Sequence, residues 1–154
     1  MTAPCRNSLP AEWAPQSGVM LTWPHKHGDW ARSLSQVEPV FTEIARQISR
    51  REKVLIACYD SRHRAHVEKL LAAAGVDLGR VIMHTVPSDD TWARDHGPLT
   101  VLCRNEPLLL DFSFNGWGGK YGYELDNQIT RRLYAQDSFG EAPLQTMDLV
   151  LEGG

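Results

Sequence analysis

The sequence predicts an α/β fold with mixed sheets and flanking helices, because helix-like and strand-like segments alternate along the chain. Residues 33–51 place apolar side chains at three- and four-residue steps, which is typical of an amphipathic helix. Residues 54–59 form a continuous apolar run of the kind found in buried strands. Residues 99–103 and 108–112 flank a turn-like link and predict a hairpin. A hairpin within such an alternation indicates a mixed rather than a purely parallel sheet.

The other elements follow the same two patterns. In chain order they are a strand at 17–23, a helix at 62–74, a strand at 80–85, a helix at 125–134 and a strand at 147–151. Pro24 closes the first of these strands, since proline cannot continue a sheet ladder. Gly75 ends the helix at 62–74 in the manner of a C-terminal cap.

Composition excludes several classes of protein. The 154 residues, 42% of them hydrophobic, suffice for one domain that buries its own core. The formal net charge of -3 lacks the basic footprint of a nucleic-acid binder, and no apolar run has the length of a membrane span. The three cysteines have the spacing of neither a disulfide framework nor a metal site, which favours a reducing cytoplasm. We therefore expect a cytoplasmic globular protein without nucleic-acid or membrane partners.

The loop at residues 88–98 carries more charged and aromatic side chains than a connection between two strands requires. The Asp95 carboxylate offers a planar guanidinium two parallel acceptors. Trp92, three residues earlier, offers an aromatic face for the same cation, a contact worth on the order of 2 kcal/mol when desolvated. The alternative is that Asp95 pairs with Arg94 or caps a turn and that Trp92 belongs to the core. The residues alone leave both interpretations open.

A second candidate segment, residues 114–122, has four glycines and three aromatic residues. So much glycine indicates unusual backbone angles or close backbone approach. The spacing is not that of a phosphate-binding loop, and neither serine nor threonine follows Lys120. The segment, with Trp117 near its middle, predicts a rigid aromatic wall of a pocket. A glycine-rich surface loop is the alternative.

The histidines give a weaker signal. His25 and His27 alternate in a polar loop, but no third ligand is near them in sequence, so we expect no metal site there. His96 is interpreted as a loop side chain, because nothing in the sequence fixes a general-base role for it.

A nucleophile and its supporting groups are also sought in the sequence. Cys58 and Cys103 lie in apolar strand-like runs, where a thiol is normally buried and unreactive. Glu152 follows the last predicted strand, where a carboxylate is able to orient a catalytic histidine. Its alternative role is that of an ordinary solvated turn residue.

Four motifs together resemble the agmatine deiminase branch of the bacterial-type peptidylarginine deiminase family. They are LPAEW at 9–13 with WP at 23–24, DTWARDHGP at 90–98, FNGWGGKY at 114–121 and LEGG at 151–154. The resemblance implies a pentein fold, a five-bladed α/β propeller of which this chain would form roughly the first half. It also implies hydrolysis of agmatine to N-carbamoylputrescine and ammonia, in putrescine biosynthesis, without metal or organic cofactor. In that chemistry a cysteine forms an amidino intermediate and a histidine serves as acid and base.

The resemblance assigns roles to four residues of this chain. Asp95 would hold the guanidinium, Trp92 would line it, Glu152 would support the histidine, and Trp117 would shape the pocket. The family's nucleophilic cysteine and its His-x-Asp pair would lie beyond Gly154. We therefore expect residues 1–154 to be the N-terminal part of a single deiminase domain, truncated after Gly154 and inactive alone.

Three alternatives stay open within this resemblance. The first alternative is a peptidylarginine deiminase, whose substrate is protein arginine instead of agmatine. A second alternative is a guanidinium binder without catalysis. The third is an inactive fragment that associates with a partner half or with itself as a homo-oligomer, through the exposed strand edges of an unfinished propeller.

Overall fold

The computed structural model describes residues 6–151. A three-stranded sheet has the order β2 (Gly18–Thr22), β3 (Lys53–Cys58) and β4 (Val81–Thr85). A four-stranded sheet has the order β1 (Asn7–Ser8), β5 (Leu99–Cys103), β6 (Glu106–Ser113) and β7 (Leu144–Val150). The helices are α1 (Leu34–Ser49), α2 (Ser61–Ala73), α3 (Ala93–His96), α4 (Gly116–Gly119) and α5 (Ile129–Tyr134), with 3-10 turns η1 (Asp29–Arg32), η2 (Leu78–Arg80) and η3 (Asp126–Gln128).

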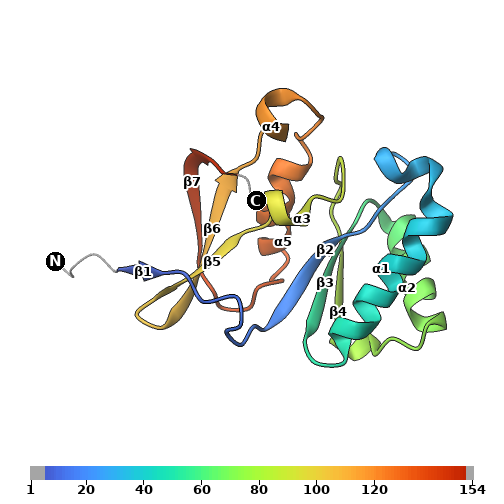
Figure 1. Ribbon diagram of the computed structural model, residues 1–154, viewed down its shortest axis with the longest axis horizontal. Helices are drawn as coiled ribbons and strands as arrows, with labels where there is room; N and C mark the ends of the chain where they lie inside the picture. Colours follow the sequence, from blue (N-terminus) through green and yellow to red (C-terminus); the bar gives the residue numbers. More distant parts are fainter. Residues whose placement is uncertain (1–5, 152–154) are drawn as a thin grey trace.

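The two sheets lie side by side, with α5 between them and with α1 and α2 on the outer side of the three-stranded sheet (Figure 1). In the three-stranded sheet both strand pairs are parallel. In the other sheet β5 pairs antiparallel with β1 and β6, whereas β7 pairs parallel with β6. The prediction of an α/β fold with a mixed sheet is therefore confirmed.

The core on the outer side of the three-stranded sheet follows from the amphipathic pattern of α1. Trp23, directly after β2, is fully buried, and its ring meets that of Phe41 edge to face with centroids 5.6 Å apart. Val54 and Ile56 of β3 and Val67 of α2 join the same cluster, each fully buried. Burying a valine or isoleucine side chain of this kind contributes roughly 1.5–3 kcal/mol.

The opposite face of β3 is buried as well. Leu55 and Ala57 pack in one cluster with Ile129 and Leu133 of α5, and with Val86 after β4. Alternate side chains of a strand point to opposite faces, so β3 needs apolar residues at every position. This double burial explains the continuous apolar run at 54–59, and it places α5 against the sheet.

The β5–β6 hairpin closes through a tighter turn than the sequence suggests. Arg104 and Asn105 both have positive φ, 54° and 68°, and Cys103 pairs with Glu106. These angles are those of a two-residue type I′ turn, whose twist matches the strands on either side. The second strand therefore begins at Glu106 rather than at residue 108.

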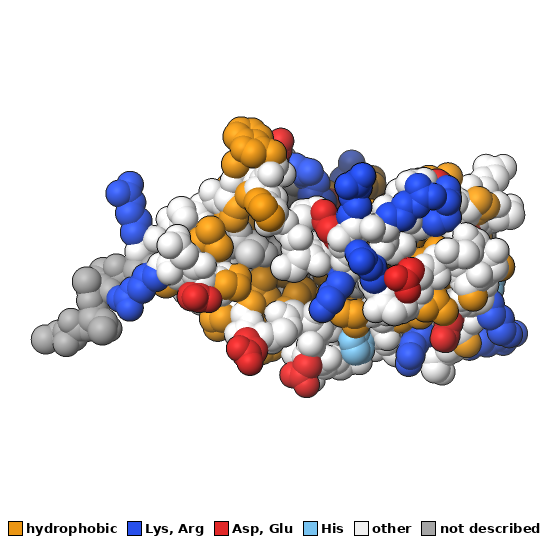
Figure 2. Space-filling view, turned by 90° about the horizontal axis from the view of Figure 1, so that it is seen from below, with side chains coloured by type: hydrophobic (Ala, Val, Ile, Leu, Met, Phe, Trp, Pro, Cys, Tyr) orange, Lys and Arg blue, Asp and Glu red, His pale blue; other side chains and the backbone are white. Residues whose placement is uncertain are grey.

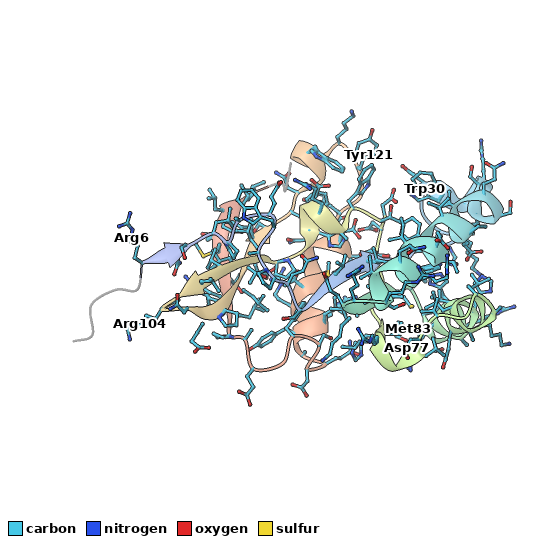
Figure 3. The ribbon with its side chains drawn as sticks, turned by 60° about the horizontal axis from the view of Figure 1, so that its bottom comes forward. Arg6, Trp30, Asp77, Met83, Arg104 and Tyr121 are labelled. Atoms are coloured by element: carbon cyan, nitrogen blue, oxygen red, sulfur yellow. The ribbon has the colours of Figure 1, made fainter. Side chains whose placement is uncertain are left out.

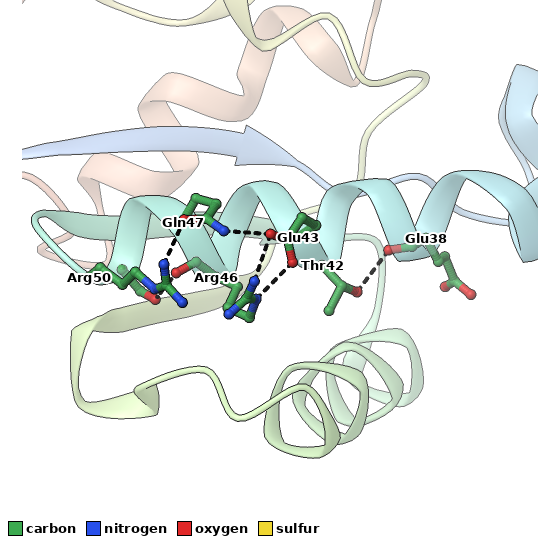
Figure 4. Close-up of polar contacts among 7 residues, drawn as sticks. Glu38, Thr42, Glu43, Arg46, Gln47 and Arg50 are labelled. Atoms are coloured by element: carbon green, nitrogen blue, oxygen red, sulfur yellow. Dashed lines mark hydrogen bonds and ion pairs between the residues drawn. The ribbon is translucent and has the colours of Figure 1, made fainter.

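The solvent-exposed face of α1 carries a chain of polar contacts (Figure 4). Glu43 accepts hydrogen bonds from Arg46 and Gln47, and Arg50 donates to Gln47. These pairs follow the three- and four-residue spacing of neighbours on a helix surface. Exposed pairs of this kind contribute little to stability, so the helix is held mainly by its buried face.

The charged side chains are mixed in sign over the face shown in Figure 2, where lysine and arginine alternate with aspartate and glutamate. The longest helix, α1, has 16 residues and a polar face. Within residues 6–151 no helix has the length and apolar composition that crossing a membrane requires.

Candidate functional site

The connection between β4 and β5 folds into the short helix α3 at its centre. Trp92 stands at the N-terminal end of α3, and its carbonyl oxygen accepts from the backbone N–H groups of Asp95 (2.9 Å) and His96 (3.1 Å). This turn brings Trp92 and Asp95 onto one small unit. Trp92 is 42% exposed and Asp95 is half-buried, so both side chains are accessible to a ligand.

Asp95 borders a small cavity of about 60 Å³, which Phe112 and Leu151 also line. Within residues 6–151 the Asp95 carboxylate has neither an ion pair nor a hydrogen bond, and the alternative pairing with Arg94 does not occur there. Arg94 also lines this cavity. A carboxylate without a partner among the described residues is suited to bind a cationic group.

Trp117 joins this unit from the glycine-rich loop. Its ring meets that of Trp92 at a centroid distance of 5.3 Å and an interplanar angle of 88°, an edge-to-face contact. Phe114 and Tyr121 contact Trp117 in the same manner, at 5.3 and 5.7 Å. Aromatic pairs favour this geometry because the positive edge of one ring faces the negative face of the other. The structure thus brings Trp92 and Trp117 together. That these rings form the wall of a pocket stays a prediction.

The backbone of this loop requires glycine. Gly116 has φ +60°, and a Cβ atom there would lie 2.6 Å from the carbonyl oxygen of Tyr121. Trp117 itself has φ 56° and ψ 53°, a left-handed conformation that is uncommon for a bulky residue. Such strain costs of the order of 1–3 kcal/mol and persists only where the surrounding packing fixes it. Tyr121 and Trp30 both lie on the upper side of the molecule in the view of Figure 3.

His96, the last residue of α3, is a buried residue and not an exposed loop side chain. It is 3% exposed, and its Nε2 lies 3.2 Å from Thr22 Oγ1. Burial lowers the pKa of His96 to about 4, so the ring is neutral at pH 7. The interpretation of His96 as an ordinary loop side chain is therefore wrong, because the short helix turns the ring inward.

Three residues that the sequence did not single out hold the two loops. Asp126, Asn127 and Thr130 lie in η3 and at the start of α5, and each makes a hydrogen bond to the backbone of the site loops. The sequence predicts only a helix at 125–134. No local pattern marks these three residues, since their partners are distant in the chain.

His25 and His27 make structural contacts. His25 Nε2 lies 3.1 Å from the carbonyl oxygen of Ser88, and its Nδ1 accepts from the backbone N–H of His27 at 3.2 Å. Both ring nitrogens of His25 are therefore used. Burial, as the largest cause, lowers the pKa of His25 to about 4. Within the described part of the chain, no group of three or more histidine, cysteine or acidic residues has the arrangement of a metal site.

A larger cavity, of about 310 Å³, opens beside His25 between the first turns of α1 and α2. Its lining includes Tyr59 and Arg62, together with Glu38 of α1 and His66 of α2. No tryptophan is among the residues that line this cavity or the smaller one, and the smaller one is distinguished by Asp95.

The remaining sequence candidates have different outcomes. Cys58 is fully buried, and burial raises its pKa to about 12, so the thiol stays protonated, as expected. Cys103 is disulfide-bonded, so the expectation of unpaired cysteines is wrong for this residue. Glu152 lies outside the described residues.

The family model of the Porphyromonas-type peptidyl-arginine deiminases matches residues 8–154. A putative agmatine deiminase of Selenomonas ruminantium is 34% identical, and the agmatine deiminase of Stutzerimonas stutzeri (strain A1501) is 33% identical. Both alignments cover 95% of this chain but only 40% and 39% of the relatives. The chain thus spans about two fifths of the length of these relatives.

Solved structures show the same fold. An agmatine deiminase of C. jejuni with substrate bound superposes with a TM-score of 0.85 at 27% identity, covering 100% of this chain and 43% of that structure. A putative arginine deiminase from Porphyromonas gingivalis superposes with a TM-score of 0.83 at 42% identity, covering 96% of this chain and 43% of that structure.

Proposed function

Because the chain belongs to the Porphyromonas-type peptidyl-arginine deiminase family, whose fold is the pentein fold, we propose that it forms the guanidinium-binding part of an agmatine deiminase. Such an enzyme hydrolyses agmatine to N-carbamoylputrescine and ammonia, a step that leads to putrescine. The proposed setting is the cytoplasm. Since the chain covers about two fifths of its relatives, the reaction is a proposal for the whole protein.

The observation that carries the proposal is the placement of Asp95, a carboxylate without a partner among residues 6–151, on the same short helix unit as Trp92, with Trp117 packed against Trp92. Agmatine carries a planar guanidinium cation. A carboxylate matches its charge and its two parallel N–H groups, and an indole ring covers its apolar faces. The cavity beside Asp95 leaves space next to the carboxylate.

In the proposed reaction these residues orient the guanidinium carbon for attack. A cysteine thiolate of the whole protein would form a covalent amidino intermediate, and water would then resolve it. Asp95 would hold two of the guanidinium nitrogens, while the third leaves as ammonia. Glu152 is proposed to support the histidine that transfers the protons. The chain alone is expected to have no turnover.

A second candidate substrate is arginine or a peptidyl-arginine. The identity of 42% with the putative arginine deiminase of P. gingivalis exceeds the 27% with the C. jejuni agmatine deiminase. The guanidinium group is common to both substrates, so the same Asp95 and Trp92 would bind it. The two candidates differ only in the group at the far end of the aliphatic chain.

Titration calorimetry of the 154-residue chain tests these proposals. We expect heat of binding with agmatine and none with putrescine, which has the same amine-bearing chain but lacks the guanidinium. Asp95→Asn should abolish the heat, whereas Glu68→Gln, an equal change of charge on the exposed side of α2, should preserve it. Stronger binding of an arginine peptide than of agmatine would favour the second candidate. Equal binding of agmatine and putrescine would contradict both.

A further inference from the structure

The buried carboxylate of Asp126 contacts the loop that leads to Trp92. Asp126 is fully buried, and its Oδ1 accepts from the backbone N–H of Asp89 at 2.7 Å. Its two oxygens share the backbone N–H of Asp90 at 3.3 and 3.2 Å. In return, the backbone N–H of Leu125 donates to Asp89 Oδ2 at 2.8 Å. The two segments are therefore clamped in both directions.

Thr130, the second residue of α5, makes a second contact. It is 1% exposed and lies four residues after Asp126 in the chain. Thr130 Oγ1 donates to the carbonyl oxygen of His96 at 3.0 Å. Asp126 thus holds the segment 89–96 near its start, and Thr130 holds it at its end. Trp92 and Asp95 lie between these two contacts.

Asn127 extends the support to the other half of the site. Its Oδ1 accepts from the backbone N–H of Phe114 at 2.9 Å. Phe114 begins the glycine-rich loop and contacts the Trp117 ring. Residues 126–130 therefore fix the backbones of both loops that meet at the Trp92–Trp117 contact.

These contacts do more than complete a helix. Asp126 has no cationic partner among residues 6–151, and only backbone N–H groups receive its charge. A buried carboxylate without a counter-ion is unfavourable for folding alone. An apolar side chain would avoid the cost of burying a charge, but it would leave the N–H groups of Asp89 and Asp90 without acceptors.

We propose that Asp126 and Thr130 are positioning residues for the guanidinium site, acting through the backbone of residues 89–96. The part of this inference that concerns ligand binding rests on the proposed function, which assigns Trp92 and Asp95 to the ligand. Its structural part, the fixed conformation of residues 89–96, stands on the hydrogen bonds alone. Neither residue touches the ligand.

Paired variants separate positioning from packing. Asp126→Leu removes the acceptors, whereas Asp126→Asn keeps one oxygen for Asp89 and Asp90. Thr130→Val removes the hydroxyl at constant volume, whereas Thr130→Ser keeps it. Val67→Ala opens a cavity in the distant core against α2 and serves as the control for lost stability. Circular dichroism of each variant confirms that it is folded under the conditions at which the variants are compared.

The first readout is hydrogen exchange of the backbone amides at 89–96. We expect at least tenfold faster exchange in Asp126→Leu and Thr130→Val than in Val67→Ala at matched stability, with Asp126→Asn and Thr130→Ser near the parent chain. Should Asp126→Leu fail to fold, Thr130→Val carries the same comparison. Equal exchange in Thr130→Val and Val67→Ala would overturn the inference.

The second readout is agmatine affinity by calorimetry. We expect at least a tenfold loss in Asp126→Leu and Thr130→Val, with recovery in the conservative variants and no loss in Val67→Ala. A parent chain that does not bind agmatine would contradict the proposed function, while the exchange readout still decides whether the residues position the loop. Full affinity in Thr130→Val, with the parent chain binding, would overturn the positioning role.

Discussion

Trp92 and Trp117 meet edge to face, with centroids 5.3 Å apart and planes at 88°, although Trp92 lies in the β4–β5 connection and Trp117 in the β6–β7 connection. The contact joins the loop that carries Asp95 to the glycine-rich loop. Trp117 also touches Phe114 and Tyr121, so a displacement of Trp117 changes the whole wall. The position of one ring therefore determines the shape of the proposed guanidinium site.

Replacing Trp117 by alanine should destabilise the chain by roughly 2 kcal/mol. The substitution removes three edge-to-face contacts, each worth about 0.5–1.5 kcal/mol, and relief of the left-handed backbone strain recovers little because alanine keeps its Cβ. Urea unfolding measures the change. Trp13→Ala, at a side chain that is 88% exposed, is the control and should change stability by less than about 0.5 kcal/mol. Equal effects of both substitutions would contradict the role given to Trp117.

Two glycines of the same loop should respond differently to alanine. Both have positive φ, but a Cβ at Gly116 would lie 2.6 Å from the Tyr121 carbonyl oxygen, whereas a Cβ at Gly118 has no atom within 4 Å. Gly118→Ala should therefore cost only the backbone strain, about 1–2 kcal/mol. Gly116→Ala should cost more and should weaken agmatine binding. Thermal unfolding compares the two variants, and a smaller loss at Gly116 would refute the close-approach argument.

The sequence predicted the parts of this molecule whose causes are local. The amphipathic period of α1 and the burial of both faces of β3 are visible in the sequence as patterns of apolar residues. The three-residue spacing of Trp92 and Asp95 corresponds to one turn at α3. The role of Asp126 leaves no such pattern, because its partners are backbone N–H groups some 36 positions away.

The same limit explains the inward turn of His96. A histidine after an aspartate looks polar and exposed in sequence. The turn of α3, however, places the His96 ring against Thr22 of β2, in the three-stranded sheet. The roles of Glu152 and of the whole domain stay predictions.

The Asp126 carboxyl should make stability fall as pH rises from about 4 to 7. Burial, the largest cause, raises its pKa from 3.8 to about 7, and the charges of Asp89 and Asp90 act in the same direction against the backbone hydrogen bonds. The folded chain then binds more protons than the unfolded chain across this window, so stability decreases with pH. Relative to Asp126→Asn, the parent chain should lose up to roughly 4 kcal/mol.

Urea unfolding of the parent chain and of Asp126→Asn at several pH values measures this difference. Only the difference is informative, since other groups titrate equally in both proteins. A constant difference between pH 4 and pH 7 would mean that Asp126 is ionised throughout, and a difference of the opposite sign would mean that its hydrogen bonds outweigh its burial.

His25 should act in the opposite direction. Its pKa falls from 6.5 to about 4, mainly through burial and then through the charge of His63, so the unfolded chain binds more protons between these values. Stability from neutral His25 is complete above about pH 6.5 and is lost as pH falls towards 4. Protonation of Nδ1 would also break the bond from the His27 N–H, because Nδ1 is its acceptor. An NMR titration of the imidazole protons measures the pKa directly, and a midpoint for His25 near 6.5 would show that the ring is solvated and does not hold the Ser88 loop.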